Sequence, residues 1–150
     1  MENKDVGELA RDYYLKGFGC AESILHAFND LRVIKVSDPL LKASTGFGTG
    51  FGGKGSTCGA ITGPIMAIGL EYGRLKPEES AEDTYRRTKK VVEAYELKYK
   101  TTICTQVTRV WRERGKFATP ERKKFCGAIV RYMARETERI LSEEDGNQRT

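Results

Sequence analysis

Apolar side chains recur every three or four residues in each longer segment of this 150-residue chain. Such spacing places apolar residues on one face of an α-helix, and no segment shows the strict alternation typical of a strand. We expect an all-α fold, a compact single-domain bundle of about six helices with a glycine-rich loop. The pattern predicts helices near residues 5–15, 20–31, 60–70, 77–100, 102–114 and 120–141, with a short one at 38–43.

Local signals define several helix boundaries. Gly17 is expected to end the first helix, and Thr119-Pro120-Glu121 begins the last with a cap, a proline and an acid in the favoured order. Pro64 lacks the N–H of a regular helix interior, so the helix near 60–70 either begins near Thr62 or is kinked. The buried stripe of the helix near 77–100 is predicted to comprise Ala81, Tyr85, Thr88, Val92, Tyr95 and Tyr99.

The composition is typical of one globular domain, with 39% hydrophobic and 31% charged residues. We expect one domain over residues 1–141 and a flexible tail over 142–150. No apolar run is long enough to cross a membrane, and the N-terminus has acids where a signal peptide needs bases. A cytoplasmic location follows, where thiols stay reduced. The four cysteines are therefore read as ligands or redox groups rather than as disulfide partners.

Three cysteines share the apolar face of their own helices. Cys20 precedes Ile24 by four residues, Cys104 precedes Val107 by three, and Cys126 precedes Ile129 by three. Residues three or four apart lie on one helix face, so these thiols are expected to point into the core and to converge. The alternative is that each cysteine packs separately as a small apolar residue.

The fourth cysteine, Cys58, lies in the segment from Gly46 to Gly63, which holds eight of the chain's sixteen glycines. Dense glycine permits positive φ angles and close backbone approach. A phosphate-binding loop is not favoured, because no strand precedes the segment and Gly55 stands where a hydroxyl should bind magnesium. We expect this backbone to approach a cofactor closely, with Gly52, Gly53, Gly55 and Gly59 as its contacts.

Four converging thiolates suit zinc or an iron–sulfur cluster, because sulfur is a soft ligand. Structural zinc usually takes cysteines in close sequence pairs, which this chain lacks. Backbone N–H groups of a glycine-rich segment can also donate to cluster sulfides. The sequence therefore favours an iron–sulfur cluster over zinc, and no catalytic acid, base or nucleophile is assigned.

The chain resembles a family of small redox-active proteins named for the cysteine pattern C, CGAxxG, C, C. Cys58-Gly59-Ala60-Ile61-Thr62-Gly63 is similar to its central motif, and Phe18-Gly19-Cys20-Ala21-Glu22-Ser23 is similar to its N-terminal element. Thr45-Gly46-Phe47-Gly48 resembles its glycine-rich lead-in, and Cys104 and Cys126 match the last two cysteines in placement. The resemblance extends from about residue 12 to 135, and Pro64 departs from it.

The resemblance implies that Cys20, Cys58, Cys104 and Cys126 together ligate an iron–sulfur cluster, expected as 2Fe–2S, since a related domain of split-Soret cytochromes has four cysteines associated with such a centre. Oxidoreductases or electron-carrier proteins are the implied partners. A homodimer is compatible with this role, although the sequence does not require one. The main alternative is a thiol–disulfide oxidoreductase in which pairs of these cysteines cycle without metal.

A further alternative concerns nucleic acid. The chain has a net charge of +5, and residues 84–139 carry 16 basic and 6 acidic residues. A basic helical segment can bind nucleic acid, but a solvated helix face explains such charge more often. Nucleic-acid binding is therefore not expected, and neither is membrane insertion.

Overall fold

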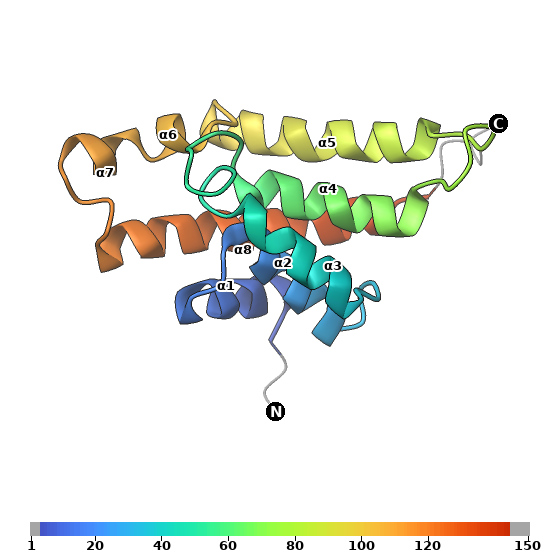
Figure 1. The fold of residues 1–150 in the computed structure, drawn as a ribbon, viewed down its shortest axis with the longest axis horizontal. Helices are drawn as coiled ribbons and strands as arrows, with labels where there is room; N and C mark the ends of the chain where they lie inside the picture. Colours follow the sequence, from blue (N-terminus) through green and yellow to red (C-terminus); the bar gives the residue numbers. More distant parts are fainter. Residues whose placement is uncertain (1–3, 145–150) are drawn as a thin grey trace.

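The computed structural model describes residues 4–144 and consists of helices (Figure 1). In chain order they are α1 (Val6–Lys16), α2 (Cys20–Asp30), α3 (Asp38–Ala43), the 3-10 helix η1 (Ser44–Phe47), α4 (Gly59–Tyr72), α5 (Glu82–Tyr99), α6 (Cys104–Val107), α7 (Arg109–Glu113) and α8 (Pro120–Ser142). Between residues 4 and 144 there is no strand, and Thr57 and Ile103 form an isolated antiparallel bridge. The predicted all-α class is confirmed.

The longest helix, α8, organises the bundle. It packs against α1 on one side and against α4 and α5 on the other, while α2 lies between α1 and α4 (Figure 1). Fully buried side chains of Ile24, Phe28, Ile68, Val91 and Met133 fill the core between these helices. No helix of the described range combines the length and apolar character needed to cross a membrane.

Helix ends follow the predicted chemistry. Gly17 ends α1 at a φ of 125°, a conformation that disfavours residues with a Cβ. The Thr119 hydroxyl accepts a hydrogen bond from the Arg122 N–H at 3.3 Å, and Pro120 occupies the first turn of α8. These two boundaries are confirmed.

Three predictions about the helices require correction. Residues 104–113 form two short helices, α6 and α7, separated at Thr108, so the described chain has eight α-helices rather than about six. The buried Thr108 hydroxyl donates to the Cys104 carbonyl at 2.6 Å at this junction, a side-chain bond that competes with regular helix. The α4 helix begins at Gly59 and includes Pro64, so the first of the two alternatives for Pro64, a helix start near Thr62, is wrong.

The third correction concerns α5, which begins at Glu82 rather than near residue 77. Tyr85 is 71% exposed, whereas Arg87, Val91 and Tyr95 form the buried face at intervals of four. The predicted stripe included the buried Tyr95 but wrongly placed Tyr85 inward and left out Arg87 and Val91. Of the predicted tail, Ser142 ends α8 and Glu143 bonds to Lys90, while residues 145–150 lie outside the described range.

Candidate functional site

The four cysteines come from four elements and line one cavity. Cys20 begins α2, Cys58 precedes α4, Cys104 begins α6 and Cys126 lies near the start of α8. All four are free thiols; Cys20 is half-buried and the others are buried. The cavity has a volume of about 20 Å³, which is enough for about one water molecule. The remaining lining residues are Tyr14, Thr49, Gly50, Gly59, Val107, Thr108, Phe117, Arg122 and Ile129.

Glycines allow the cysteine-bearing segments to approach one another. A Cβ added at Gly59 would lie 3.0 Å from the Cys20 Cβ, which is tighter than ordinary side-chain contact. A Cβ at Gly50 would lie 2.9 Å from the Cys104 Cβ and 2.4 Å from the Ser56 nitrogen. Gly50 also has a φ of 67°, which glycine adopts without steric cost. Both glycines therefore serve the close approach that their density in the sequence predicted.

Backbone hydrogen bonds fix Cys58 beside Cys104. The Cys58 N–H donates to the Thr102 carbonyl at 2.9 Å, and the Cys104 N–H donates to the Ser56 carbonyl at 2.6 Å. These reciprocal bonds flank the bridge between Thr57 and Ile103. Residues 46 positions apart in sequence thus become neighbours at one edge of the cavity.

Cys20 and Cys58 interact directly. A hydrogen bond between the two thiols lowers the pKa of Cys58 to about 7, although burial opposes this change. The same hydrogen bond, together with burial, raises the pKa of Cys20 well above its usual value. Cys58 is therefore the thiol of the pair that loses its proton more readily, and a thiolate is the nucleophilic form of a cysteine.

Tyr95 of α5 provides a polar atom beside this pair. Its hydroxyl is buried and makes no fully formed hydrogen bond within the described residues. The interaction of this hydroxyl with Cys58 lowers the pKa of the Cys58 thiol. The pKa of the Tyr95 hydroxyl is raised, mainly because it is buried and also because of the negative charge of the nearby Cys58. An unsatisfied buried donor aimed at a sulfur is costly unless the sulfur carries negative charge.

The other two cysteines face arginines. The Arg112 Nη2 lies 3.8 Å from the Cys104 Sγ, and Arg122 donates toward Cys126. Burial raises the pKa of both thiols, and the guanidinium groups partly oppose that effect. The Phe117 ring stacks with both guanidinium groups. Its centroid lies 4.0 Å from the Cζ of Arg112 and 4.2 Å from the Cζ of Arg122. Each of these thiols therefore has a cation that would stabilise its thiolate.

The predicted glycine contacts divide into two groups. Gly59 lines the cavity with the cysteines. Gly52 and Gly53 lie at the exposed tip of the loop with open space around them, and Gly55 packs against Thr105, so these three are not among the cavity-lining residues.

Sequence reasoning missed several residues of the site. Arg122 lies four residues before Cys126 and so shares its helix face, a signal that could have identified it. Tyr95 was predicted only as a core residue. Arg112 follows Cys104 by eight residues, about two helical turns, so the spacing within the predicted helix could have identified it. Phe117 lies beyond that predicted helix, and nothing in the sequence marked it.

Four cysteine sulfurs are ligands that suit soft metal ions. In this structure they are free thiols. Within residues 4–144, no three His, Cys, Asp or Glu side chains form a group close enough to hold a single metal ion. Four sulfurs around one cavity, with the Tyr95 hydroxyl and two guanidiniums directed at them, nevertheless fit a thiolate-ligated group that carries negative charge. Binding such a group would replace the Cys20–Cys58 hydrogen bond by bonds to the metal.

Comparison with known proteins identifies the family. No curated protein and no solved structure matches the chain at a significant level. Residues 18–140 match the family described as "Putative redox-active protein (C_GCAxxG_C_C)". The family is named for GCAxxG, with glycine before the cysteine, so the CGAxxG pattern attributed to it above is wrong; in this chain Cys58 precedes Gly59. Since this match includes all four cysteines and most of the chain, the protein belongs to this redox-active family.

Proposed function

We propose that the protein is a small electron-transfer protein in which Cys20, Cys58, Cys104 and Cys126 ligate an iron–sulfur cluster, with 2Fe–2S as the expected type. The observation that carries the proposal is that all four thiols line one cavity. A disulfide would use only two of them, and separate core packing would not bring four together. When bound, the cluster would supply one-electron chemistry.

The chain's own residues would support that role. Arg112 and Arg122 would offset the negative charge of the Cys104 and Cys126 sulfurs, and Tyr95 would donate to the Cys58 sulfur. Donors and charges around the ligand sulfurs shift the reduction potential. The walls formed by Val107, Phe117 and Ile129 would keep water from the sulfurs.

The expected partners are oxidoreductases or electron-carrier proteins, and the expected setting is the cytoplasm, where free thiols persist. The protein would then act as an accessory redox protein rather than as a stand-alone enzyme.

The full chain purified without oxygen tests this proposal. It should be coloured and contain iron and acid-labile sulfide, and each single Cys→Ser substitution should reduce both. Ser80→Cys adds an exposed thiol away from the cavity and should leave the iron content unchanged. Colourless protein that iron and sulfide cannot reconstitute would exclude the cluster.

A second candidate is thiol–disulfide exchange by Cys20 and Cys58, favoured by their hydrogen bond. The Cys58 thiolate would attack a partner disulfide, and the Cys20 sulfur would then displace the partner thiol. Two electrons and two protons leave the cysteine pair as its S–S bond forms and the partner disulfide becomes two thiols. Trapping thiols across a redox titration should show one two-electron couple that requires Cys20 and Cys58 and persists in Cys104→Ser. Absence of any interchanging pair would eliminate this candidate.

A further inference from the structure

The protein's excess positive charge gathers in one segment. Residues 109–124 contain seven arginines and lysines and two glutamates. That excess of five equals the formal net charge of the entire chain. Residues 84–108 and 125–139 carry a further excess of five, which acidic residues elsewhere in the chain offset. Residues 109–124 are therefore the most densely basic stretch, and they give this part of the molecule a positive electrostatic potential.

The cations of this segment divide by direction. Arg112 and Arg122 face the cavity and are engaged with Cys104, Cys126 and Phe117. The outward members are the exposed residues Arg109, Arg114, Lys116 and Lys124, together with the half-buried Lys123. We call these five residues the basic rim.

Acidic side chains of the protein neutralise little of the positive charge of the basic rim. Its one ion pair within the described residues joins Arg109 to Glu113 at 3.8 Å, between side chains that are 72% and 70% exposed. An exposed pair at that distance contributes little. Farther along α8, by contrast, Arg131, Arg135 and Arg139 each form ion pairs with carboxylates. The cations of the basic rim are therefore less neutralised by neighbouring acids than those farther along α8.

This end is also where the cavity lies. The segment from α6 to the start of α8 contributes Val107, Thr108, Phe117 and Arg122 to the cavity wall. In Figure 1, α6, α7 and the start of α8 occupy one end of the bundle, with the glycine-rich loop beside α6. A partner that covers the basic rim would therefore lie beside one wall of the cavity that holds the four thiols.

We propose that the basic rim is the docking surface for an acidic one-electron carrier protein, an inference that rests on the proposed electron-transfer function. The reduced group of the carrier would lose one electron to the oxidised iron–sulfur cluster that the four cysteines would hold, and no atom would be transferred. Opposite charges steer the two proteins together and orient the carrier toward the cavity, an effect that weakens with salt. Nucleic acid is the less favoured occupant, because its binding gives no reason for the cations to surround a thiol cavity.

Charge reversal with a matched control tests the docking surface. The rim variant carries Arg114→Glu, Lys116→Glu and Lys124→Glu, three exposed side chains outside the cavity wall. The control variant carries Lys35→Glu, Lys76→Glu and Lys89→Glu, which change the net charge equally at exposed sites elsewhere. Unchanged thermal midpoints would establish that both variants fold.

The full-length proteins are titrated against a fluorescently labelled acidic flavodoxin at low salt, with basic cytochrome c and duplex DNA as comparison ligands. The dissociation constant for flavodoxin should rise more than about tenfold in the rim variant and less than about twofold in the control. Equal weakening in both variants, tighter binding to DNA than to flavodoxin, or no flavodoxin binding would each overturn the inference.

This titration does not require a bound cluster, so its failure is separate from failure of the proposed function. Protein that contains iron and sulfide but does not bind flavodoxin would refute the docking surface alone. Colourless protein that binds flavodoxin would refute the proposed function and, with it, the electron-transfer role of the rim.

Discussion

Tyr95 places a buried hydroxyl next to a sulfur without a fully formed hydrogen bond. A buried donor of this kind usually costs stability, because it gives up its bonds to water and gains none. Its presence in a fully buried tyrosine is understandable if the Cys58 sulfur is charged in the working protein. The hydroxyl would then stabilise the protein with a charged Cys58 sulfur relative to the protein with a neutral Cys58 thiol.

Replacing Tyr95 by phenylalanine tests this role. In metal-free protein, Tyr95→Phe should change the free energy of unfolding by less than about 1 kcal/mol, because the lost donor is unsatisfied. The hydroxyl lowers the pKa of Cys58, so its removal should raise that pKa and move the pH profile of Cys58 alkylation to higher pH. In cluster-loaded protein the reduction potential should fall, because a donor to a ligand sulfur is gone.

Tyr99→Phe is the matched control for this substitution, since Tyr99 lies one turn along α5 and packs against the Tyr95 ring at 5.0 Å between centroids. It should leave the alkylation profile of Cys58 largely unchanged. An unshifted profile in Tyr95→Phe would mean that the hydroxyl does not act on Cys58.

Helices α2 and α4 cross in close contact, and this crossing positions two of the four cysteines. A Cβ added at Gly63 would lie 2.8 Å from the Ala21 Cα and 2.9 Å from the Ala21 carbonyl oxygen. Both atoms belong to backbone and cannot move without shifting α2. Gly69, two turns later on α4, has no such neighbour within 4 Å.

Alanine at these two glycines should have opposite effects. Gly63→Ala should destabilise the protein by about 1–3 kcal/mol, because the new methyl group forces the helices apart. Gly69→Ala should stabilise it by about 0.5–1 kcal/mol, because alanine favours a helix interior and the space is open. Urea denaturation measures both, and a Gly63→Ala variant as stable as the parent would contradict the close-crossing interpretation.

The elements that sequence predicted well are those governed by local chemistry. The cap at Thr119 and the stop at Gly17 depend on neighbouring backbone atoms, so residue type was sufficient. The three-and-four spacing gave the inward direction of Cys104 and Cys126, which are buried. Their role as metal ligands remains a prediction.

Features that depend on distant contacts could not be predicted in this way. Arg87 is fully buried because its partners are carbonyls more than fifty residues later in the chain. The loop glycines looked equivalent in sequence, yet Gly50 and Gly59 line the cavity while Gly52 and Gly53 lie at an open tip. Which glycine approaches a cysteine is decided by tertiary packing.

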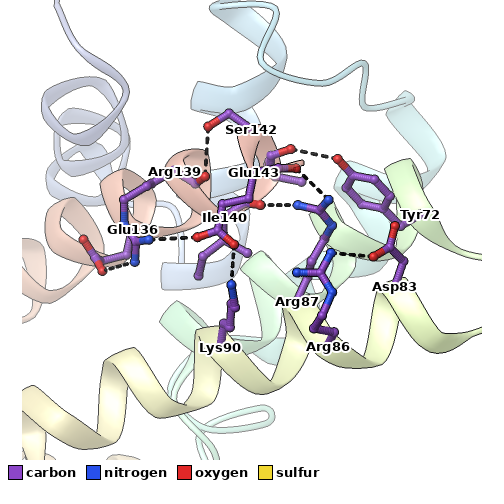
Figure 2. A network of polar contacts seen from close by, with 11 residues as sticks. Tyr72, Asp83, Arg86, Arg87, Lys90, Glu136, Arg139, Ile140, Ser142 and Glu143 are labelled. Carbon is purple, nitrogen blue, oxygen red and sulfur yellow. Dashed lines mark hydrogen bonds and ion pairs between the residues drawn. The ribbon is translucent and has the colours of Figure 1, made fainter. Parts of the chain in front are cut away.

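At the scale of the whole molecule, a polar network joins α5 to the end of α8 (Figure 2). Arg87 donates to the Ile140 carbonyl and, at 2.7 Å, to the Glu143 carbonyl, while its guanidinium stacks on the Tyr72 ring at 3.9 Å. The Glu143 carboxylate pairs with Lys90 at 2.5 Å and with Arg139 at 2.9 Å. The network therefore holds α5 and the end of α8 together at the end of the bundle that lies opposite the cysteine cavity.

The Glu143 pairs predict a pH-dependent contribution to stability. The hydrogen bond from Lys90 lowers the pKa of Glu143 from its usual 4.5, so the folded state favours the ionised carboxylate. At neutral pH, Glu143→Gln should cost about 0.5–1 kcal/mol. This difference should be present above pH 4.5 and disappear as the pH falls through the lowered folded-state pKa.

Chemical denaturation of both proteins between neutral and acidic pH measures this difference. Glu138→Gln, at an exposed position near the end of α8, is the control and should differ little from the parent at any pH. A Glu143→Gln cost that stays constant into acid would show that the carboxylate charge is not responsible.

The buried arginine also has a practical consequence for making this protein. Its acceptors at Ile140 and Glu143 are backbone atoms, so no side-chain choice can replace them if the chain is shortened. A clone ending before Glu143 would remove one of these acceptors from the buried guanidinium and should be less stable. Affinity tags and fusion partners at the C-terminus should therefore be attached after Glu144, and proteolytic trimming for crystallisation should stop at the same point.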